Sequence, residues 1–125
     1  MSLDVYLKSD TRKEIVTCHC CGHSSEEEVS DTLFDSNITH NLGRMAEAAG
    51  IYKHCWRPEE IGISKARQLI QPLEEGLQKL KSDPEAFKVH NASNGWGLYE
   101  HFVPWVEEYL KACKEYPDAN VSAYR

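Results

Sequence analysis

The segment Leu3-Asp4-Val5-Tyr6-Leu7 decides how the fold begins, because its apolar residues alternate with polar or amphipathic ones. A period of two is typical of a β-strand with one buried face. After the turn-like residues 8–11, Glu14–Thr17 can return as a second strand, and residues 29–34 suggest a third. The tail Asn120–Tyr124 alternates in the same way and can close the sheet beside the first strand.

Helices are predicted wherever apolar residues recur every three or four positions. The first helix is expected over Asn37–Gly50, with Ser36 or Asn37 as its cap and Gly50 in the left-handed position at its end. A short helical turn is expected over residues 83–87, where Asp83 precedes Pro84.

Two longer helices complete the expected fold. One begins at Ser64 and runs to Leu80, and Pro72 should kink it because proline lacks a donor and crowds the preceding turn. The other covers residues 98–113, with a break expected near Pro104. The sequence therefore predicts a single α+β domain over residues 1–125, a small and mostly antiparallel sheet of three to four strands packed against about three helices.

The hexapeptide Cys18-His19-Cys20-Cys21-Gly22-His23 suggests a metal site in a hairpin region at about residues 14–30. Cys18 and Cys21 have the spacing of a zinc knuckle, in which a tight turn directs two thiolates at one cation and glycine permits the turn. Structural zinc usually takes four ligands, so Cys20 and His23 are the nearest further candidates. We expect a structural zinc with a zinc-knuckle-like turn.

The remaining zinc ligands are left open by the sequence, because a second Cys-x-x-Cys pair is absent. Distant ligands from His40, His54 or Cys55 would make a split site. A zinc held between two chains would also supply the missing pair and make the protein a homodimer. The alternative is a reduced, thiol-rich surface turn without metal.

Composition narrows the classes of function. The chain has 125 residues and a formal net charge of −6, which argues against sequence-independent nucleic-acid binding. Five cysteines in a chain without a visible export signal or membrane span favour a reducing compartment. The sequence therefore predicts a cytoplasmic protein with no membrane partner.

Two groups of residues suggest a ligand site. Asn37, His40 and Asn41 would share one face of the first predicted helix and could bind a polar or anionic ligand. The alternative is that Asn37 only caps the helix while the other two bond to a neighbouring loop. In the connector 51–62, Trp56 and Arg57 could grip a planar or anionic group.

Each connector residue also has a structural interpretation, in which Trp56 fills the core and Arg57 pairs with a nearby carboxylate. Trp96 lies between two glycines in the loop 94–97 and can form a pocket wall or simply part of a tight turn.

The segments 37–42, 56–62, 94–97 and 102–106 (NITHNL, WRPEEIG, NGWG and FVPWV) resemble a group of short uncharacterised proteins carried by phages and found in bacterial genomes. The resemblance extends over most of the chain. It implies a small accessory protein of phage origin, in the bacterial host cytoplasm, with no mechanism attached.

The resulting hypothesis is a binding module for a host protein or a small anionic ligand such as a nucleotide, with counter-defence as one role in the phage context. The first alternative is a metal-dependent or histidine-based hydrolase that uses His40, Arg57 and either Glu59 or Glu60. The second alternative is a zinc-knuckle nucleic-acid binder with a basic edge at Lys8, Arg12, Lys13 and His19, which the net charge disfavours.

Overall fold

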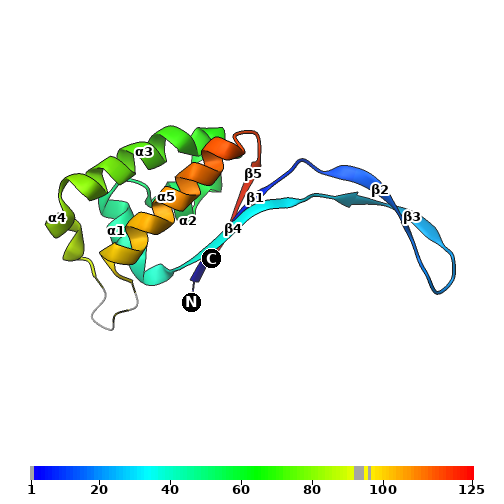
Figure 1. The fold of residues 1–125 in the computed structure, drawn as a ribbon, viewed down its shortest axis with the longest axis horizontal. Coiled ribbons are helices and arrows are strands. Elements are labelled where there is room, and N and C mark those ends of the chain that lie inside the picture. The colour runs from blue at the N-terminus through cyan, green and yellow to red at the C-terminus, as the bar shows by residue number, and fades with distance from the viewer. Residues whose placement is uncertain (1, 92–94, 96) are drawn as a thin grey trace.

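The computed structural model describes residues 2–91, 95 and 97–125. It consists of a body, in which helices pack on a three-stranded sheet, and a two-stranded arm that projects from it (Figure 1). The arm comprises β2 (Arg12–Thr17), β3 (Ser24–Val29) and the tip loop 18–23 between them. The structure thus confirms the α+β class and divides the described strands between two sheets.

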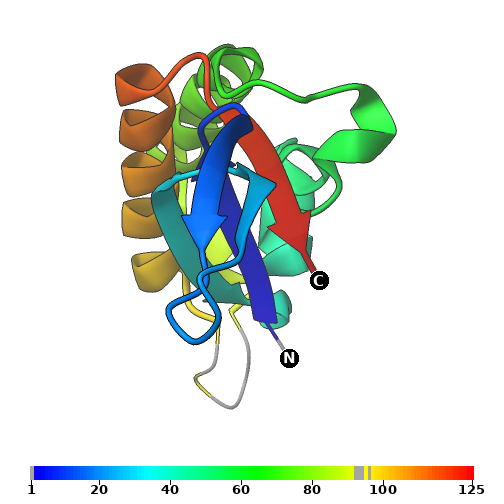
Figure 2. The same cartoon turned by 90° about the vertical axis from the view of Figure 1, so that its right-hand side faces the viewer.

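The sheet of the body has the order β4-β1-β5 and is antiparallel throughout. Its strands are β1 (Ser2–Lys8), β4 (Thr32–Thr39) and β5 (Asn120–Tyr124). Helices lie on one side of this sheet (Figure 2). Leu3, Val5 and Leu7 alternate along β1 and are fully buried in the core. The predicted first strand and the predicted closure by the tail are both confirmed.

The helical elements follow β4 in the chain, and the last of them leads into β5. They are η1 (His40–Leu42), α1 (Gly43–Ala48), α2 (Tyr52–Trp56), η2 (Pro58–Ile61), α3 (Arg67–Ser82), α4 (Pro84–Lys88) and α5 (Tyr99–Glu115). α3 and α5 pack against each other along their length. The core they enclose is rich in aromatic rings, with Trp105 edge-on to Tyr109 at 5.4 Å between centroids and stacked on Phe102 at 6.1 Å.

The predicted helix over Asn37–Gly50 is wrong at its first three residues, 37–39, which belong to a strand. Asn37 and Ile38 belong to β4, where they lie opposite Asp4 and Leu3 of β1. Pairing with β1 buries Ile38 and satisfies its backbone, and this outweighs the helical spacing of the local sequence. The helical turn begins only after Thr39, whose Oγ1 accepts a hydrogen bond from the Asn41 N–H at 3.3 Å.

Two further expectations about helices need correction. α5 is not broken at Pro104. α3 contains Pro72 and runs on to Ser82, and the kink expected at Pro72 stays a prediction. α3 also begins later than Ser64, because residues 64–66 pair with the C-terminal segment. The Val121 N–H donates to the Ser64 carbonyl at 2.9 Å, which uses that backbone as a sheet edge and not as a helical turn.

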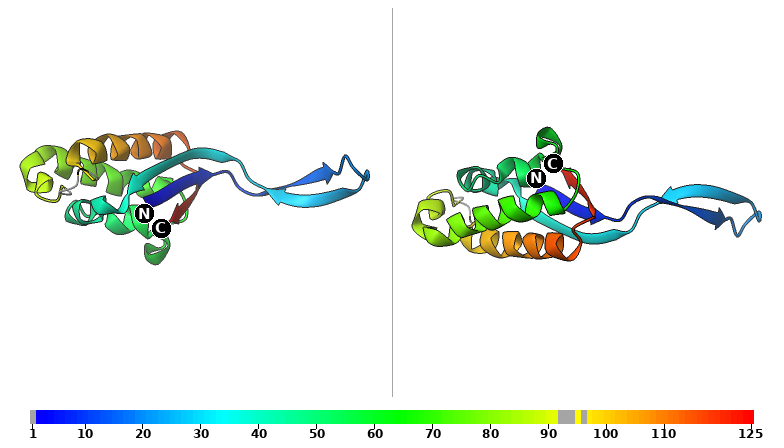
Figure 3. Two further views of the ribbon diagram at one scale, coloured as in Figure 1. Left: turned by 90° about the horizontal axis from the view of Figure 1, so that it is seen from below. Right: turned by 90° about the horizontal axis from the view of Figure 1, so that it is seen from above.

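The arm is separate from the core. β2 and β3 pair in register from Arg12 opposite Val29 to Thr17 opposite Ser24, and the views in Figure 3 show them extending beyond the body. Among the residues whose burial is described, no core residue lies between Leu7 and Phe34. None of the described helices is long and apolar enough to cross a membrane.

Candidate binding pocket

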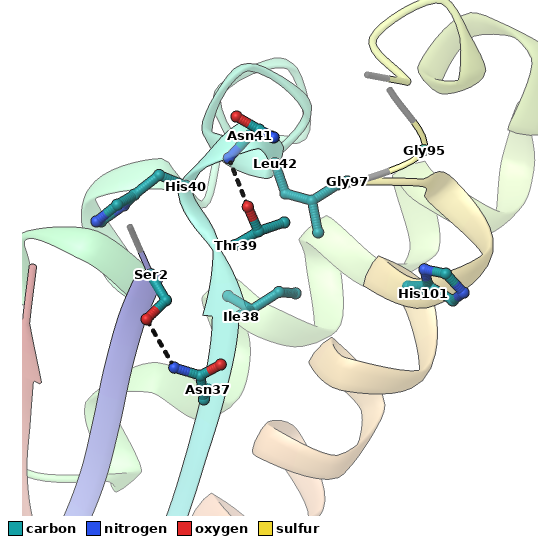
Figure 4. Close-up of a pocket in the computed structure, with 10 residues that line it drawn as sticks. All are labelled: Ser2, Asn37, Ile38, Thr39, His40, Asn41, Leu42, Gly95, Gly97 and His101. Carbon is teal, nitrogen blue, oxygen red and sulfur yellow. Dashed lines mark hydrogen bonds between the residues drawn. The ribbon is translucent and has the colours of Figure 1, made fainter. Parts of the chain in front are cut away.

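A pocket of about 1130 Å³ lies where the end of β4 meets the start of α5 (Figure 4). Its described lining consists of Ser2, Asn37, Ile38, Thr39, His40, Asn41, Leu42, Gly95, Gly97 and His101. The structure therefore brings Asn37, His40 and Asn41 to one cavity, as residues of a strand end and a 3-10 turn instead of a single helix face.

Asn37 is held at the sheet side of the pocket by its amide nitrogen. Nδ2 donates to Ser2 Oγ at 2.9 Å and to Asp4 Oδ1 at 2.8 Å. With its donors engaged across the sheet, the Asn37 side chain keeps its carbonyl oxygen as an acceptor.

A hydrogen bond from the buried Trp56 orients His40. The indole Nε1 of Trp56 donates to His40 Nδ1 at 2.9 Å, so the neutral imidazole carries its proton on Nε2 and is a donor there. Trp56 itself is only 2% exposed and stacks on Tyr52 with 5.5 Å between ring centroids. Trp56 is thus a core residue that positions His40, and it does not belong to the described pocket lining.

The other wall comes from the segment that leads into α5. His101 is an exposed residue of α5, and Figure 4 shows it and His40 on opposite sides of the end of β4. Gly97 has φ of +120°, and a Cβ there would lie 2.8 Å from the Cβ of Asn41. Glycine at this position therefore lets the segment approach the strand end closely. Trp96 lies outside the described residues.

The described lining of the pocket consists of hydrogen-bonding and apolar residues without an acidic or strongly basic side chain. Its described lining contains two imidazoles, two amides and two hydroxyls, and no Lys, Arg, Asp or Glu. Among these lining residues an anion meets hydrogen-bond donors and no carboxylate, and the Asp4 carboxylate next to them accepts a hydrogen bond from Asn37. A cation would find no charged partner among the same residues.

Arg57, Glu59 and Glu60 do not line this pocket. Arg57 pairs with Glu60 at 2.8 Å, and Glu59 accepts a 2.7 Å hydrogen bond from Arg125. Hydrogen bonding from Arg125 lowers the pKa of Glu59. These carboxylates are committed to surface ion pairs, as the structural interpretation of Arg57 anticipated.

The tip of the arm holds the cysteine-rich hexapeptide in a tight loop. The Cys18 N–H donates to the His23 carbonyl at 2.7 Å, and the Gly22 N–H donates to the Cys18 carbonyl at 2.8 Å. Gly22 has φ of +70°, the left-handed conformation that glycine adopts readily. Hydrogen bonds from the backbone of Cys21 and of Cys20 lower the pKa of the Cys18 thiol.

The tip does not bring the expected zinc ligands together in a finished site. Cys18, Cys20 and Cys21 are exposed, whereas Cys55 is buried in the body. Within the described part of the chain, no three His, Cys, Asp or Glu residues are arranged to hold a metal ion. Zinc at Cys18, Cys21, Cys20 and His23 therefore stays a prediction.

Ser2, Thr39, Gly97 and His101 were not singled out from the sequence as ligand residues. Ser2 is remote in sequence and reaches the pocket only because it pairs with Thr39 in the sheet. Thr39 carried a usable signal, since a Thr two residues before Asn41 is a capping pattern. His101 carried none, because its helix position alone does not say which cavity it faces.

No protein-family model, curated protein or solved structure matches the chain.

Proposed function

We propose that the protein is a binding module whose pocket holds a small, elongated anionic ligand of about nucleotide size. The observation that carries the proposal is a pocket of about 1130 Å³ whose described lining offers several hydrogen-bonding side chains and no carboxylate. Small-molecule sites combine apolar walls with a few fixed polar groups in this way. Ile38 and Leu42 supply the apolar part here.

The shape of the ligand follows from the positions of the two imidazoles. His40 and His101 lie on opposite sides of the end of β4, so a ligand that contacts both must extend across the strand end (Figure 4). The Nε2 proton of His40 suits an anionic oxygen, and the Asn37 carbonyl suits a donor such as a hydroxyl or an amine. A nucleoside monophosphate offers both kinds of group.

The proposal favours the small ligand over the host protein as partner, and binding over turnover. The hydrolase alternative needs Glu59 or Glu60 beside His40, but both carboxylates are paired with arginines away from the pocket lining. The basic edge of the nucleic-acid alternative is weakened because Arg12 is paired with Glu14 and Asp31. In the phage setting that the sequence resemblance implies, a module of this kind would act by stoichiometric capture of its ligand.

Isothermal titration calorimetry tests the proposal with adenosine 5′-monophosphate, guanosine 5′-monophosphate, ribose 5-phosphate and inorganic phosphate. We expect at least one to bind with a stoichiometry of one per chain. Replacing the exposed His101 by Ala should weaken that binding at least about tenfold, since a hydrogen bond to a charged group is worth about 1.5–3 kcal/mol. His19→Ala at the arm tip is the matched control and should bind like the wild type. No binding by any of the four probes, or equal binding by His101→Ala, would contradict the proposal.

A further inference from the structure

The arm lacks the usual sources of hairpin stability. A two-stranded hairpin is marginal in water unless a third strand or a helix covers it, and β2 and β3 form a sheet of only two strands. Glu14 lies directly opposite Glu27, a like-charge pair that destabilises the ladder. Ile15 is 78% exposed. The core does not reach the far end of this arm, where the ladder is joined by contacts such as the 3.1 Å hydrogen bond between Thr17 Oγ1 and Ser24 Oγ.

The tip loop already has the backbone of a metal knuckle. Its two backbone hydrogen bonds, from Cys18 N–H to His23 and from Gly22 N–H to Cys18, close the turn. The N–H groups of Cys20 and Cys21 hydrogen-bond to the Cys18 thiol. The turn thus keeps Cys18 and Cys21, the two thiols with the zinc-knuckle spacing, in one short loop.

Among the described residues, the tip of one chain does not bring together enough ligands for structural zinc. Structural zinc takes four ligands, and the described residues contain no metal-binding group of three or more. His40, His54 and Cys55 belong to the body, while the arm carries its tip away from the body, as the side views in Figures 1 and 3 show. A split site between the tip and these residues is therefore excluded by the geometry of the arm.

We infer that Cys18 and Cys21 of two chains together bind one zinc ion, which joins the two arms tip to tip. A two-fold axis through the metal repeats the same thiolate pair and yields the four-cysteine set that structural zinc prefers. A second copy of the chain is the simplest occupant, because it brings a pair identical in spacing and geometry. The exposure of Cys18 and Cys21 leaves both thiols accessible to it.

The negative charge of both chains opposes their association, but it does not prevent the zinc-linked dimer. Each chain carries a formal charge of −6, and Glu26, Glu27 and Glu28 lie close to the tip in the sequence. Because the arms hold the two bodies apart, the repulsion between the bodies acts over distances longer than the screening length of about 8 Å at physiological salt, whereas the repulsion between the glutamates of the two arms acts near the tip. The bonds to zinc act locally, at the tip.

Native mass spectrometry and light scattering, with a phosphine reductant present and zinc added as the probe, test the inference. We expect a dimer with one zinc per two chains, and monomers after chelation. Cys18→Ser/Cys21→Ser should be monomeric and free of zinc. Cys20→Ser and His23→Ala are the matched controls from the same loop and should keep the zinc-linked dimer.

Cobalt substitution gives a second readout, because Co²⁺ bound by thiolates absorbs strongly in the near ultraviolet. Saturation is expected at half an equivalent of Co²⁺ per chain. One metal per chain, loss of metal in Cys20→Ser or His23→Ala, no metal at all, or a dimer that survives chelation under reducing conditions would each overturn the inference. The inference does not rest on the proposed function, since the pocket and its calorimetric test involve only the body.

Discussion

At the residue scale, the packing around a side chain decides what that side chain does. Trp56 is an example, because its ring is in the core while its Nε1 fixes His40 at the pocket. The sequence suggested both a core role and a ligand-binding role for Trp56, and only the packing around it could decide between them. Asn37, His40 and Asn41 could be named from the sequence, whereas the partners that orient them come from β1 and α2.

The five cysteines should divide by reactivity in the same way. Cys18, Cys20 and Cys21 are exposed, and hydrogen bonds from the Cys21 and Cys20 backbone lower the pKa of Cys18. Burial raises the pKa of Cys113 to about 12 and raises the pKa of Cys55 further. We expect iodoacetamide to modify the three tip thiols of the chelator-treated native protein, and the two buried thiols only after unfolding. Intact-mass analysis measures this, and early modification of Cys55 or Cys113 would contradict the packing described.

His54 should make stability depend on pH. Burial lowers its pKa in the folded state, with a weaker opposing contribution from the Gly50 backbone. The unfolded chain therefore binds the proton first as pH falls through about 6.5, and stability is lost on acidification below that value. We expect His54→Gln to reduce the difference between the free energies of unfolding at pH 7.5 and 5.5, measured with urea. His19→Ala, at the exposed tip, should leave this difference unchanged, and an equal effect of both substitutions would refute the role of His54.

At the element scale, strand pairing determines the secondary structure of segments whose local pattern of apolar residues predicts another structure. The apolar period of residues 37–50 fits a helix, yet Asn37 and Ile38 are in β4 because β1 offers them a ladder. The strand Leu3–Leu7 was predictable because its alternation matches its burial residue by residue. The same limit applies to α3, where the start of the helix is displaced by the backbone pairing of residues 64–66.

Two glycines in one segment allow a direct test of how the pocket wall is built. Gly97→Ala would place a Cβ 2.8 Å from the Asn41 Cβ at a φ of +120°, and we expect a loss of about 1–3 kcal/mol in stability. Gly95 has φ of +78° with no atom within 4 Å of an added Cβ, so Gly95→Ala should cost only about 1 kcal/mol. Urea unfolding measures both. Equal losses would show that the segment does not press on the end of β4.

At the scale of the whole molecule, the α+β class and the closure of the sheet by the tail could be predicted from alternation and helical spacing. The separation of body and arm could not, because Glu14–Thr17 looks like any strand and nothing local says that it leaves the sheet. β2 lies outside the sheet of the body because it lacks apolar partners there. β3 is almost wholly exposed, and β2 has no core residue among those described.

The body should therefore fold without the arm. Replacing residues 9–31 by Asn-Gly joins Lys8 to Thr32, which are already partners in the sheet, through a turn suited to a hairpin. The deletion removes exposed contacts such as the one between Asp10 and Lys65 at 3.1 Å, and such pairs contribute at most about 1 kcal/mol. We expect a cooperative thermal transition, monitored by circular dichroism, and retained ligand binding in the pocket. An unfolded or aggregated product would show that the arm is part of the folding unit.

The most direct test of the central claim, that the pocket holds a small anionic ligand, uses the six histidines as internal probes. Imidazole resonances of ¹⁵N-labelled protein can be followed while adenosine 5′-monophosphate is added. The pocket described here predicts that the signals of His40 and His101 shift together and saturate at one ligand per chain, while those of His19 and His23 at the arm tip stay in place. No shift at His40 and His101, or shifts confined to the arm tip, would contradict it.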